Sequence, residues 1–224
     1  STPVVIDDAL FVKLISQQNT LVHALFTTGR NLGAVASGTA GFFESFQSPA
    51  EMARHELEAT EKMRELGLNT PEPIEAFEAE GYGVVVFEYL PAFRPLDSLN
   101  PKTESWVAEE LFAALRTLHD AGLAHGDLRA ENVLLLGDEL YFIDATSVDG
   151  DTQEGIRSYD LACALAALEP ILGARAAVAA AEPSYPMTDL LSAADFLHFV
   201  QLRPDHDFAA AGLRSEIEHR ATAE

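Results

Sequence analysis

The sequence is poor in lysine and cysteine. It holds only three lysines, and its 14 basic residues face 36 acidic ones, which gives a formal charge of −22. Such a charge repels nucleic acid and anionic membranes, so we expect neither as a direct partner. An acidic, lysine-poor surface suits a salt-rich cytoplasm, where screening weakens self-repulsion, and we interpret it as the mark of a halophilic archaeon. The single cysteine, Cys163, cannot form an internal disulfide and suits a reducing cytoplasm.

Long apolar runs are also absent. No stretch approaches the ~18 residues of a membrane-spanning helix, and the first residues lack the basic and apolar regions of a secretory signal. An apolar fraction of 48% is nevertheless that of a folded protein. The 224 residues suffice for one mid-sized domain or two small lobes.

The hydrophobic pattern predicts a β-rich first third and a helical remainder. In the first third we expect strands over 3–6 and 9–15 about a turn at Asp7-Asp8, a helix over 49–66, and strands over 74–77 and 84–89 about a Gly81-Tyr82-Gly83 turn. In the remainder we expect a helix from Thr103 to Gly122 and a hairpin of 133–136 with 140–143. Helices follow after Tyr159 and are broken at Pro170, Pro183, Pro186 and Pro204. This order is an α+β layout. We expect an N-lobe over 1–90, with a long insertion over 16–48, and a helical C-lobe over 91–224.

A polar loop after the helix that ends at Gly122 carries the groups that phosphoryl transfer needs. It places Asp127 and Asn132 five residues apart, and the strand pair that follows ends in Asp144. The chemistry requires a carboxylate that orients and deprotonates the attacking hydroxyl, and oxygen ligands for Mg²⁺. Asp127 fits the first role, while Asn132 and Asp144 fit the second. The alternative is that all three are ordinary polar residues of a helix-to-strand loop.

This segment resembles the protein-kinase-like superfamily, whose catalytic loop reads His-x-Asp-x-x-x-x-Asn and precedes a strand that ends in a metal-binding Asp. The resemblance implies a bilobal protein-kinase-like fold, with a small N-lobe and a helical C-lobe. It also implies binding of ATP together with Mg²⁺ or Mn²⁺.

Two departures from the common pattern indicate a subgroup. Gly126 stands where protein kinases regulated through an activation loop carry Arg. Ala145-Thr146 follows Asp144 in place of Phe-Gly. Both features resemble RIO-type atypical kinases, the small kinase of the tRNA-modification complex, lipopolysaccharide-core kinases and antibiotic phosphotransferases. Control by phosphorylation of an activation loop is therefore not expected.

The superfamily also needs a strand lysine paired with a glutamate on the following helix. Lys13 is the only lysine in an expected strand, so the resemblance gives it the phosphate-binding role; the alternative is a charge that protects an edge strand. Glu56, Glu58 and Glu61 all qualify as its partner. We select Glu56, because its spacing of eleven residues before Gly67 resembles RIO-type and tRNA-modification kinases. The alternative is a solvated glutamate.

The run from Val84 to Leu90 resembles the strand and hinge that grip adenine. Phe87 would take the gatekeeper place. The carbonyl of Glu88 and the amide of Leu90 would hydrogen-bond the purine edge. A buried sheet strand is the plainer interpretation, and both can hold together.

Three further residues have roles that the resemblance implies. Arg129, two positions after Asp127, would reach the γ-phosphate or a neighbouring carboxylate, or else form a surface ion pair with Glu131. His125 would brace the loop and the metal-binding segment. Asp160 would open a C-lobe helix and brace the catalytic loop.

One expected part is missing, because no Gly-rich loop precedes Lys13. The glycines from Gly29 to Gly41 come after it. Either the N-terminus is truncated or the phosphate lid is built from other residues, as in some atypical kinases. Residues 16–48 are long for a strand-to-helix link, and RIO-type kinases carry a flexible insertion at this place.

These features predict a RIO-like atypical serine/threonine kinase or ATPase, which transfers the γ-phosphoryl group of ATP in line to a protein or small-molecule acceptor. Two alternatives stay open. A small-molecule kinase of the aminoglycoside-phosphotransferase type would be favoured by an acid-lined C-lobe pocket. A nucleotide-binding pseudokinase is the other, although Lys13, Asp127, Asn132 and Asp144 are all present.

Overall fold

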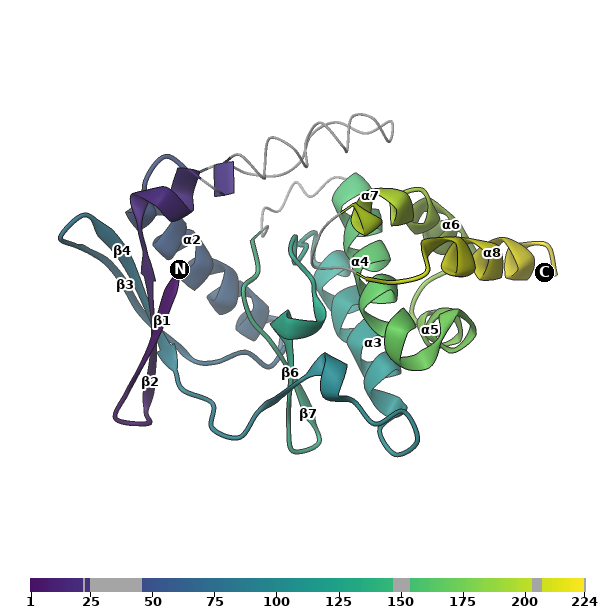
Figure 1. The fold of residues 1–224 in the computed structure, drawn as a ribbon, viewed down its shortest axis with the longest axis horizontal. Coiled ribbons are helices and arrows are strands. Elements are labelled where there is room, and N and C mark those ends of the chain that lie inside the picture. Colours follow the sequence, from purple (N-terminus) through teal and green to yellow (C-terminus); the bar gives the residue numbers. More distant parts are fainter. Residues whose placement is uncertain (22, 25–45, 147–153, 203–206, 224) are drawn as a thin grey trace.

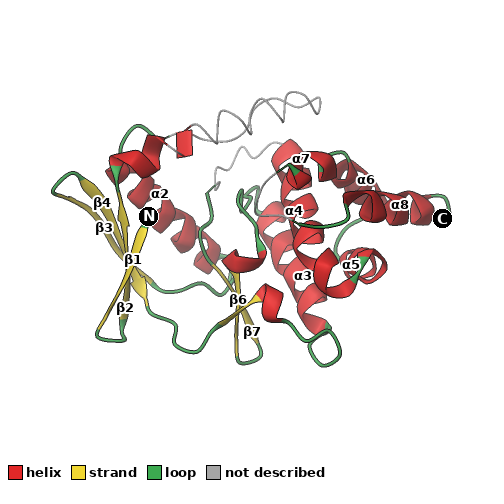
Figure 2. Cartoon of the chain, in the orientation of Figure 1, coloured by secondary structure: helices red, strands yellow, loops and turns green. Residues whose placement is uncertain are grey.

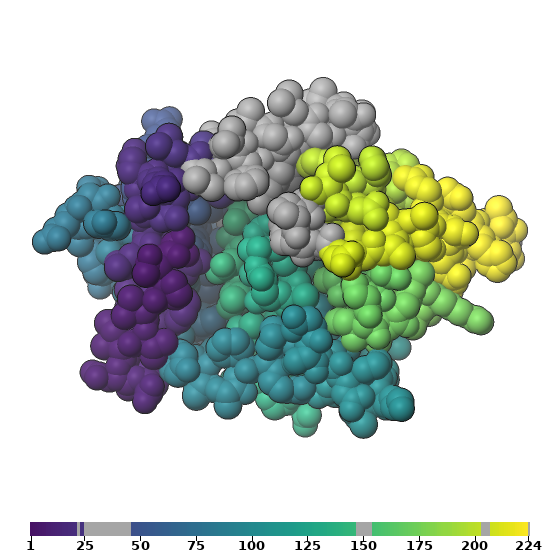
Figure 3. All heavy atoms as spheres, viewed as in Figure 1, coloured from purple at the N-terminus to yellow at the C-terminus, as the bar shows by residue number. Residues whose placement is uncertain are grey.

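A four-stranded sheet and a group of helices form the two lobes of the protein (Figure 1). The computed structural model describes residues 1–21, 23–24, 46–146, 154–202 and 207–223. The larger sheet and one long helix lie at one side of the molecule, and most of the other helices lie at the opposite side (Figure 2). The space-filling view shows the N-terminal strands and the C-terminal helices at opposite ends (Figure 3). The expected α+β kinase-like layout, with a β-rich N-lobe and a helical C-lobe, is confirmed.

The N-lobe sheet is antiparallel throughout and consists of two hairpins joined along their inner strands. Its strand order is β1-β2-β4-β3, so β1 and β3 are the edges. The strands are β1 (Thr2–Ile6), β2 (Leu10–Ile15), β3 (Pro73–Ala79) and β4 (Tyr82–Glu88). Lys13 of β2 lies opposite Val85 of β4, which places the lysine on an inner strand.

Both hairpin turns use backbone conformations with positive φ. Asp7 and Asp8 have φ values of 53° and 52°, a region in which short polar side chains are tolerated. In the second hairpin, Glu80 (φ 52°) and Gly81 (φ 81°) form the turn. The expected turn over residues 81–83 was too long, because two residues with positive φ suffice to reverse an antiparallel pair.

Helix α2 (Pro49–Glu65) packs against one face of this sheet. The Ser48 hydroxyl accepts a hydrogen bond from the Glu51 amide, so the predicted N-cap is confirmed. Ala53 of the helix packs with Ile15, Val85 and Phe87 of the sheet in a small buried cluster. The helix thus fixes the position of the inner strands from one side.

The C-lobe contains a small three-stranded sheet and a group of helices. The sheet, in the order β5-β6-β7, consists of β5 (Arg94–Pro95), β6 (Val133–Leu136) and β7 (Glu139–Phe142). The helices in the described parts of the chain are α3 (Trp106–Asp120), α4 (Glu154–Leu172), α5 (Ala174–Ala181), α6 (Met187–Ala194), the short α7 (Leu197–Gln201) and α8 (Ala210–Ala221). Two 3₁₀ turns, η1 (Leu96–Ser98) and η2 (Ala130–Asn132), precede α3 and β6.

Helix α4 differs from expectation at both ends. It begins at Glu154, before Tyr159, and it continues past Pro170 to Leu172. A proline lacks an amide hydrogen and crowds the preceding turn, but here it lies within the last turn, where the helix is about to end. Asp160 is therefore an inner residue of α4 and does not open the helix, so that expectation was wrong.

Other expectations fall outside the described residues. Gly29, Gly33, Gly38 and Gly41 lie within 25–45, and Pro204 lies within 203–206. Residues 17–21 and 23–24, which follow β2, are helical. Across the described ranges, no helix has the length and apolar character needed to cross a membrane.

The contact between β4 and the start of α2 gives a first prediction. A Cβ atom on Gly83 would lie 1.9 Å from the backbone oxygen of Pro49, and backbone cannot move aside as a side chain can. We expect Gly83→Ala to lower the free energy of unfolding by about 1–3 kcal/mol or more. Urea denaturation measures this change.

Gly212→Ala is the matched control. The nearest atom to a Cβ at Gly212, in α8, is the Ala209 Cβ at 3.6 Å, an ordinary contact. This variant should unfold like the parent or be up to ~1 kcal/mol more stable. Equal effects of the two substitutions would show that β4 and α2 do not meet as described.

Candidate functional site

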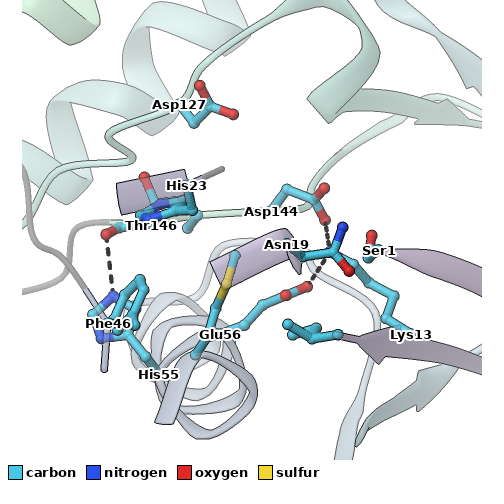
Figure 4. A pocket seen from close by; sticks show the side chains of 13 residues that line it. Ser1, Lys13, Asn19, His23, Phe46, His55, Glu56, Asp127, Asp144 and Thr146 are labelled. Atoms are coloured by element: carbon cyan, nitrogen blue, oxygen red, sulfur yellow. Dashed lines mark hydrogen bonds and ion pairs between the residues drawn. The ribbon is translucent and has the colours of Figure 1, made fainter. Parts of the chain in front are cut away.

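Lys13 brings together three parts of the chain that are distant in sequence. Its Nζ lies 2.5 Å from Oε1 of Glu56 and 2.9 Å from Oδ1 of Asp144. The lysine comes from β2, the glutamate from α2, and Asp144 from the segment after β7 (Figure 4). Among the three candidate glutamates, Glu56 is thus the one that the fold brings to Lys13. The side chains of Lys13 and Glu56 are each only 10% exposed.

Burial and the neighbouring charges shift the pKa values of Lys13 and Glu56 in opposite directions. Burial alone would lower the pKa of Lys13, but the carboxylates of Glu56 and Asp144 raise it well above its ordinary value. The ammonium form is therefore maintained at all physiological pH values. Burial also raises the pKa of Glu56, which Lys13 opposes. A cation fixed in this way can hold an anionic ligand.

The catalytic-loop residues are held by bonds within the loop. The Nδ2 amide of Asn132 donates to the backbone oxygen of Asp127 at 2.8 Å, which leaves Oδ1 as the atom of Asn132 suited to a metal. The backbone oxygen of Asn132 accepts from the amide of Ile143 at 3.1 Å. This bond ties the loop to the strand that leads into Asp144.

His125 also connects the loop that carries Asp127 to the segment around Asp144. Its Nε2 donates to the carbonyl of Ile143 at 3.0 Å, and its backbone oxygen accepts from the Thr146 amide at 2.8 Å. Since a carbonyl only accepts, Nε2 carries the hydrogen, and Nδ1 faces the Asp127 amide at 3.4 Å. Burial lowers the pKa of His125, against the nearby carboxylates, which raise it. The neutral ring fits this arrangement, as the bracing role required.

Asp160 of α4 supports the loop from the other side. This fully buried carboxylate accepts hydrogen bonds from the backbone amides of His125 (2.5 Å) and Gly126 (2.9 Å). Gly126 has a φ of +79°, a conformation that a side chain rarely adopts. The Gly at this position is therefore explained by the backbone path over Asp160. Asp144 also has positive φ, at 60°.

Arg129 contacts two carboxylates, those of Asp127 and Glu131. Its Nη2 lies 3.2 Å from Oδ2 of Asp127, and its Nη1 forms an ion pair with Oε1 of Glu131. The surface pairing with Glu131 is thus present, together with a contact to the candidate catalytic carboxylate. A role toward a phosphate stays a prediction.

Two cavities flank the Lys13 cluster. One, of about 140 Å³, is bordered by Asp127 and by residues of α2. The other, of about 210 Å³, is bordered by Phe87, as a gatekeeper would be. Lys13, Glu56 and Asp144 border both. Because ligand pockets are typically ~300–1,000 Å³, a nucleotide would have to extend over both cavities.

The remaining residues of the expected adenine site are less closely associated. Glu88 ends β4, and Leu90 follows it as a buried residue. Neither borders the two cavities. The Tyr89 amide between them donates to the Ala9 carbonyl at 2.9 Å, which fixes this connector to the first hairpin. Hydrogen bonds from Glu88 and Leu90 to a purine stay predictions.

The oxygen atoms of Asp144 and Asn132 would bind a divalent ion only together with oxygens from a bound ligand. Asp144 offers a carboxylate and Asn132 an amide oxygen. In the described ranges, no three His, Cys, Asp or Glu side chains are grouped as a metal site. Mg²⁺ is commonly bound by one or two carboxylates together with phosphate oxygens and water. The residues therefore suit Mg²⁺ bound with a nucleotide more than a metal site made by the protein alone.

Sequence reasoning missed an aromatic group that lines the same cavity as Asp127. The ring of Phe46 lies 5.2 Å from that of His23 and 4.8 Å from that of His55. His55 also contacts the Thr146 carbonyl through Nε2 at 3.1 Å (Figure 4). All three residues border the smaller cavity. Nothing in their spacing distinguishes them, apart from the position of His55 next to Glu56.

Comparison with known proteins identifies the family. The model of the RIO domain matches residues 44–157, half of the chain. The chain belongs to the RIO domain family. The match contains α2 with Glu56, the catalytic loop and Asp144, whereas Lys13 and Asp160 lie outside it. The RIO-type resemblance of the catalytic loop is thereby confirmed.

Individual relatives of this RIO domain protein are distant. "KEOPS complex subunit Bud32" of Pyrococcus abyssi is 29% identical over 115 residues, which are 50% of this chain and 51% of Bud32. "Probable serine/threonine-protein kinase fnkE" of Dictyostelium discoideum is 36% identical over 59 residues, 25% of this chain and 4% of that protein. The chain thus spans about half of one relative and a small part of the other. Among solved structures, WaaP in complex with acyl carrier protein matches with a TM-score of 0.43 and 19% identity, over 76% of each chain.

The buried imidazole of His125 gives a prediction about pH. Its pKa in the folded protein lies below the ~6.5 of an unfolded histidine, so the unfolded chain binds the proton more readily. The stability that His125 contributes is therefore present above pH ~6.5 and is lost as the pH falls below it. We expect the free energy of unfolding of His125→Asn to change less than that of the parent between about pH 8 and 5.5.

The exposed His219 provides the control. Urea denaturation across this range should give parallel curves for His219→Asn and the parent. A His125→Asn curve that also runs parallel to the parent would contradict the neutral, buried state of His125.

Proposed function

We propose that the protein is an ATP-dependent phosphotransferase, a RIO-like atypical serine/threonine kinase or ATPase. The observation that carries the proposal is the contact of one buried ammonium, Lys13, with carboxylates from both lobes. Phosphoryl transfer relies on positioning and charge. A cation fixed between Glu56 and Asp144, with the Asp127 loop across the same cavity, supplies both.

Each residue has a role in this proposal. Lys13 would bind the phosphates, and Glu56 would hold Lys13 in place. Asp144 and Asn132 would ligate Mg²⁺ or Mn²⁺, which would neutralise charge on the phosphates. Asp127 would orient the attacking hydroxyl or water and accept its proton.

The surroundings of Asp127 support this last role. Arg129 contacts its carboxylate, and the bond from Asn132 holds its backbone. In transfer, the acceptor oxygen would form a bond to the γ-phosphorus while the bond to the leaving oxygen of ADP breaks, and the acceptor proton would pass to Asp127. The acceptor is a protein or small molecule in a kinase and water in an ATPase. Arg129 would then contact the transferred phosphoryl group.

The small-molecule alternative gains no specific support. The C-lobe does hold an acid-lined cavity, which contains Asp120, Glu154 and Asp189. However, Asp127 does not border it, so that cavity is not the place where an acceptor would meet the catalytic carboxylate. The kinase or ATPase function therefore remains the proposal. We propose that the protein acts in the cytoplasm, without direct contact with nucleic acid or membrane.

A substitution at Asp144 tests the metal role. Asp144→Asn replaces a charged oxygen ligand by a neutral one and weakens the hold on Lys13, so ATP affinity in the presence of Mg²⁺ should fall by about tenfold or more. Isothermal titration of ATP with and without Mg²⁺ measures this. We also expect the parent to bind ATP far more weakly without metal. Equal affinity of parent and variant under both conditions would remove Asp144 from the metal site.

A substitution at Asp127 tests whether the protein is an enzyme. Asp127 is expected to contact the attacking oxygen more than the resting nucleotide, so its removal should act on the chemical step. Asp127→Ala should bind Mg²⁺-ATP like the parent but lose phosphate release or transfer by about 10²- to 10⁴-fold. Labelled ATP, followed separately as released phosphate and as label on lysate proteins, measures both activities.

The control is Asp138→Ala, at the exposed turn between β6 and β7. It should retain full activity. All assays require salt at which parent and variants melt alike, since a chain of charge −22 can unfold at low salt by self-repulsion. A parent that binds ATP but shows no turnover would make the protein a pseudokinase.

A further inference from the structure

A polar cavity of about 330 Å³ lies in the C-lobe, away from the Lys13 cluster. It lies between the end of α3, the start of α4 and α6. The lining includes Arg116, His119, Arg157, Ser158, Tyr185 and Ser192. Its lining residues border neither of the two cavities beside Lys13. It is therefore a separate site, and the proposed phosphotransfer leaves it without a role.

Arg157 is the unexplained residue of this cavity. It is half-buried, and its Nε is a buried nitrogen without a hydrogen-bond partner in the described parts of the chain. Burial of a guanidinium is unfavourable unless it is paired. With 36 acidic residues in the sequence, carboxylate partners are plentiful. Other arginines have them, as shown by the ion pairs of Arg94 with Glu104, Arg116 with Asp120 and Arg220 with Glu182.

The carboxylates of the cavity are directed to a different cation. Arg116 lies 2.8 Å from Asp120 and 3.6 Å from Asp189, and its guanidinium stacks over the Tyr185 ring at 5.7 Å. The third acid, Glu154, is exposed. The positive charge that remains for a ligand is thus that of Arg157. Ser158, next to it in the chain, borders the same space.

We propose that this cavity binds a small molecule through an anionic group, either a phosphate or a carboxylate, which Arg157 holds. The Nη hydrogens of a guanidinium form a fork that matches two oxygens of either group. Ser158 would add a hydroxyl contact, and the volume of about 330 Å³ suits a small metabolite.

Two residues that line the cavity, Tyr185 and His119, are hydrogen-bonded towards Asp160, which holds the loop before Asp127. Tyr185 donates its hydroxyl hydrogen to Nδ1 of His119 at 2.9 Å, since Nε2 of His119 faces the Asp160 carboxylate at 3.5 Å. Asp160 in turn accepts from the amides of His125 and Gly126. A molecule in this cavity would therefore contact Tyr185 and His119, which are bonded in turn to Asp160.

Direct binding tests the proposal without reference to activity. Inorganic phosphate and malonate, titrated into the full chain by calorimetry at fixed potassium chloride, should show which of the two groups is preferred. Arg157→Gln should weaken binding of the preferred anion by about tenfold or more, as expected for loss of a charge-assisted contact. Arg175→Gln removes the same charge from an exposed position on α5 and should bind like the parent.

Two further variants distinguish this site from the cleft between the lobes and from a folding defect. Ser192→Leu fills the cavity without a change in charge and should also abolish binding, which covers the case that Arg157→Gln does not fold. Lys13→Met should keep the binding. The proposal is overturned if the parent binds neither anion. It is equally overturned if Arg175→Gln loses as much as Arg157→Gln, or if Lys13→Met alone loses binding.

Tungstate gives the location independently. Soaked into crystals of the full chain, this oxyanion should give an anomalous peak within hydrogen-bond distance of the Arg157 side chain. A peak at Lys13 with none at Arg157 would place anion binding in the cleft between the lobes and refute the second site.

Discussion

The contact of Lys13 with Glu56 and Asp144 is the constraint on which the arrangement of the two lobes depends. A buried ammonium is unfavourable without partners, and its two partners come from α2 and from the segment after β7. The lysine is satisfied only when helix and C-lobe segment both approach β2. Separation of the lobes would leave the Lys13 ammonium exposed to solvent or buried without a partner. The same cation that a phosphate would require thus also fixes the distance between sheet, helix and catalytic segment.

Asp160 plays the corresponding part within the C-lobe. It is fully buried, yet its oxygens are engaged by two backbone amides and by His119, so the cost of burying the carboxylate is offset. The amides belong to the residues just before Asp127. Because α4 is packed into the main core through Leu161, Leu165 and Leu168, the loop that carries Asp127 is connected to that core. Lys13 positions one side of the cleft, and Asp160 positions the other.

The sequence was sufficient for those features that depend on local pattern or on a motif. The hairpins, the N-cap at Ser48 and the catalytic loop follow from turn residues, capping chemistry and the His-Gly-Asp spacing. The choice of Glu56 among three helix acids needed the resemblance, since all three lie on the same helix. The start of α4 and the short strand β5 were missed. Both depend on tertiary packing, because the early α4 residues and Arg94–Pro95 carry no strong periodicity. The cavity around Arg157 joins three helices that are far apart in sequence, and no linear pattern predicts it.

The charges of the cleft lead to a stricter requirement for metal than the family pattern alone. Three carboxylates, those of Glu56, Asp127 and Asp144, face two cations, Lys13 and Arg129. A nucleoside triphosphate would add several negative charges to a cluster that is already net negative. Potassium at high concentration screens exposed charges over distances beyond ~3–10 Å, but it acts much less on groups as buried as Lys13 and Glu56. A salt-rich solvent can therefore stabilise the acidic surface without making the cleft receptive to phosphate. In the proposed function, a divalent cation at Asp144 and Asn132 would place positive charge where this repulsion would arise, and for this reason we expect salt and metal to be independent requirements of nucleotide binding.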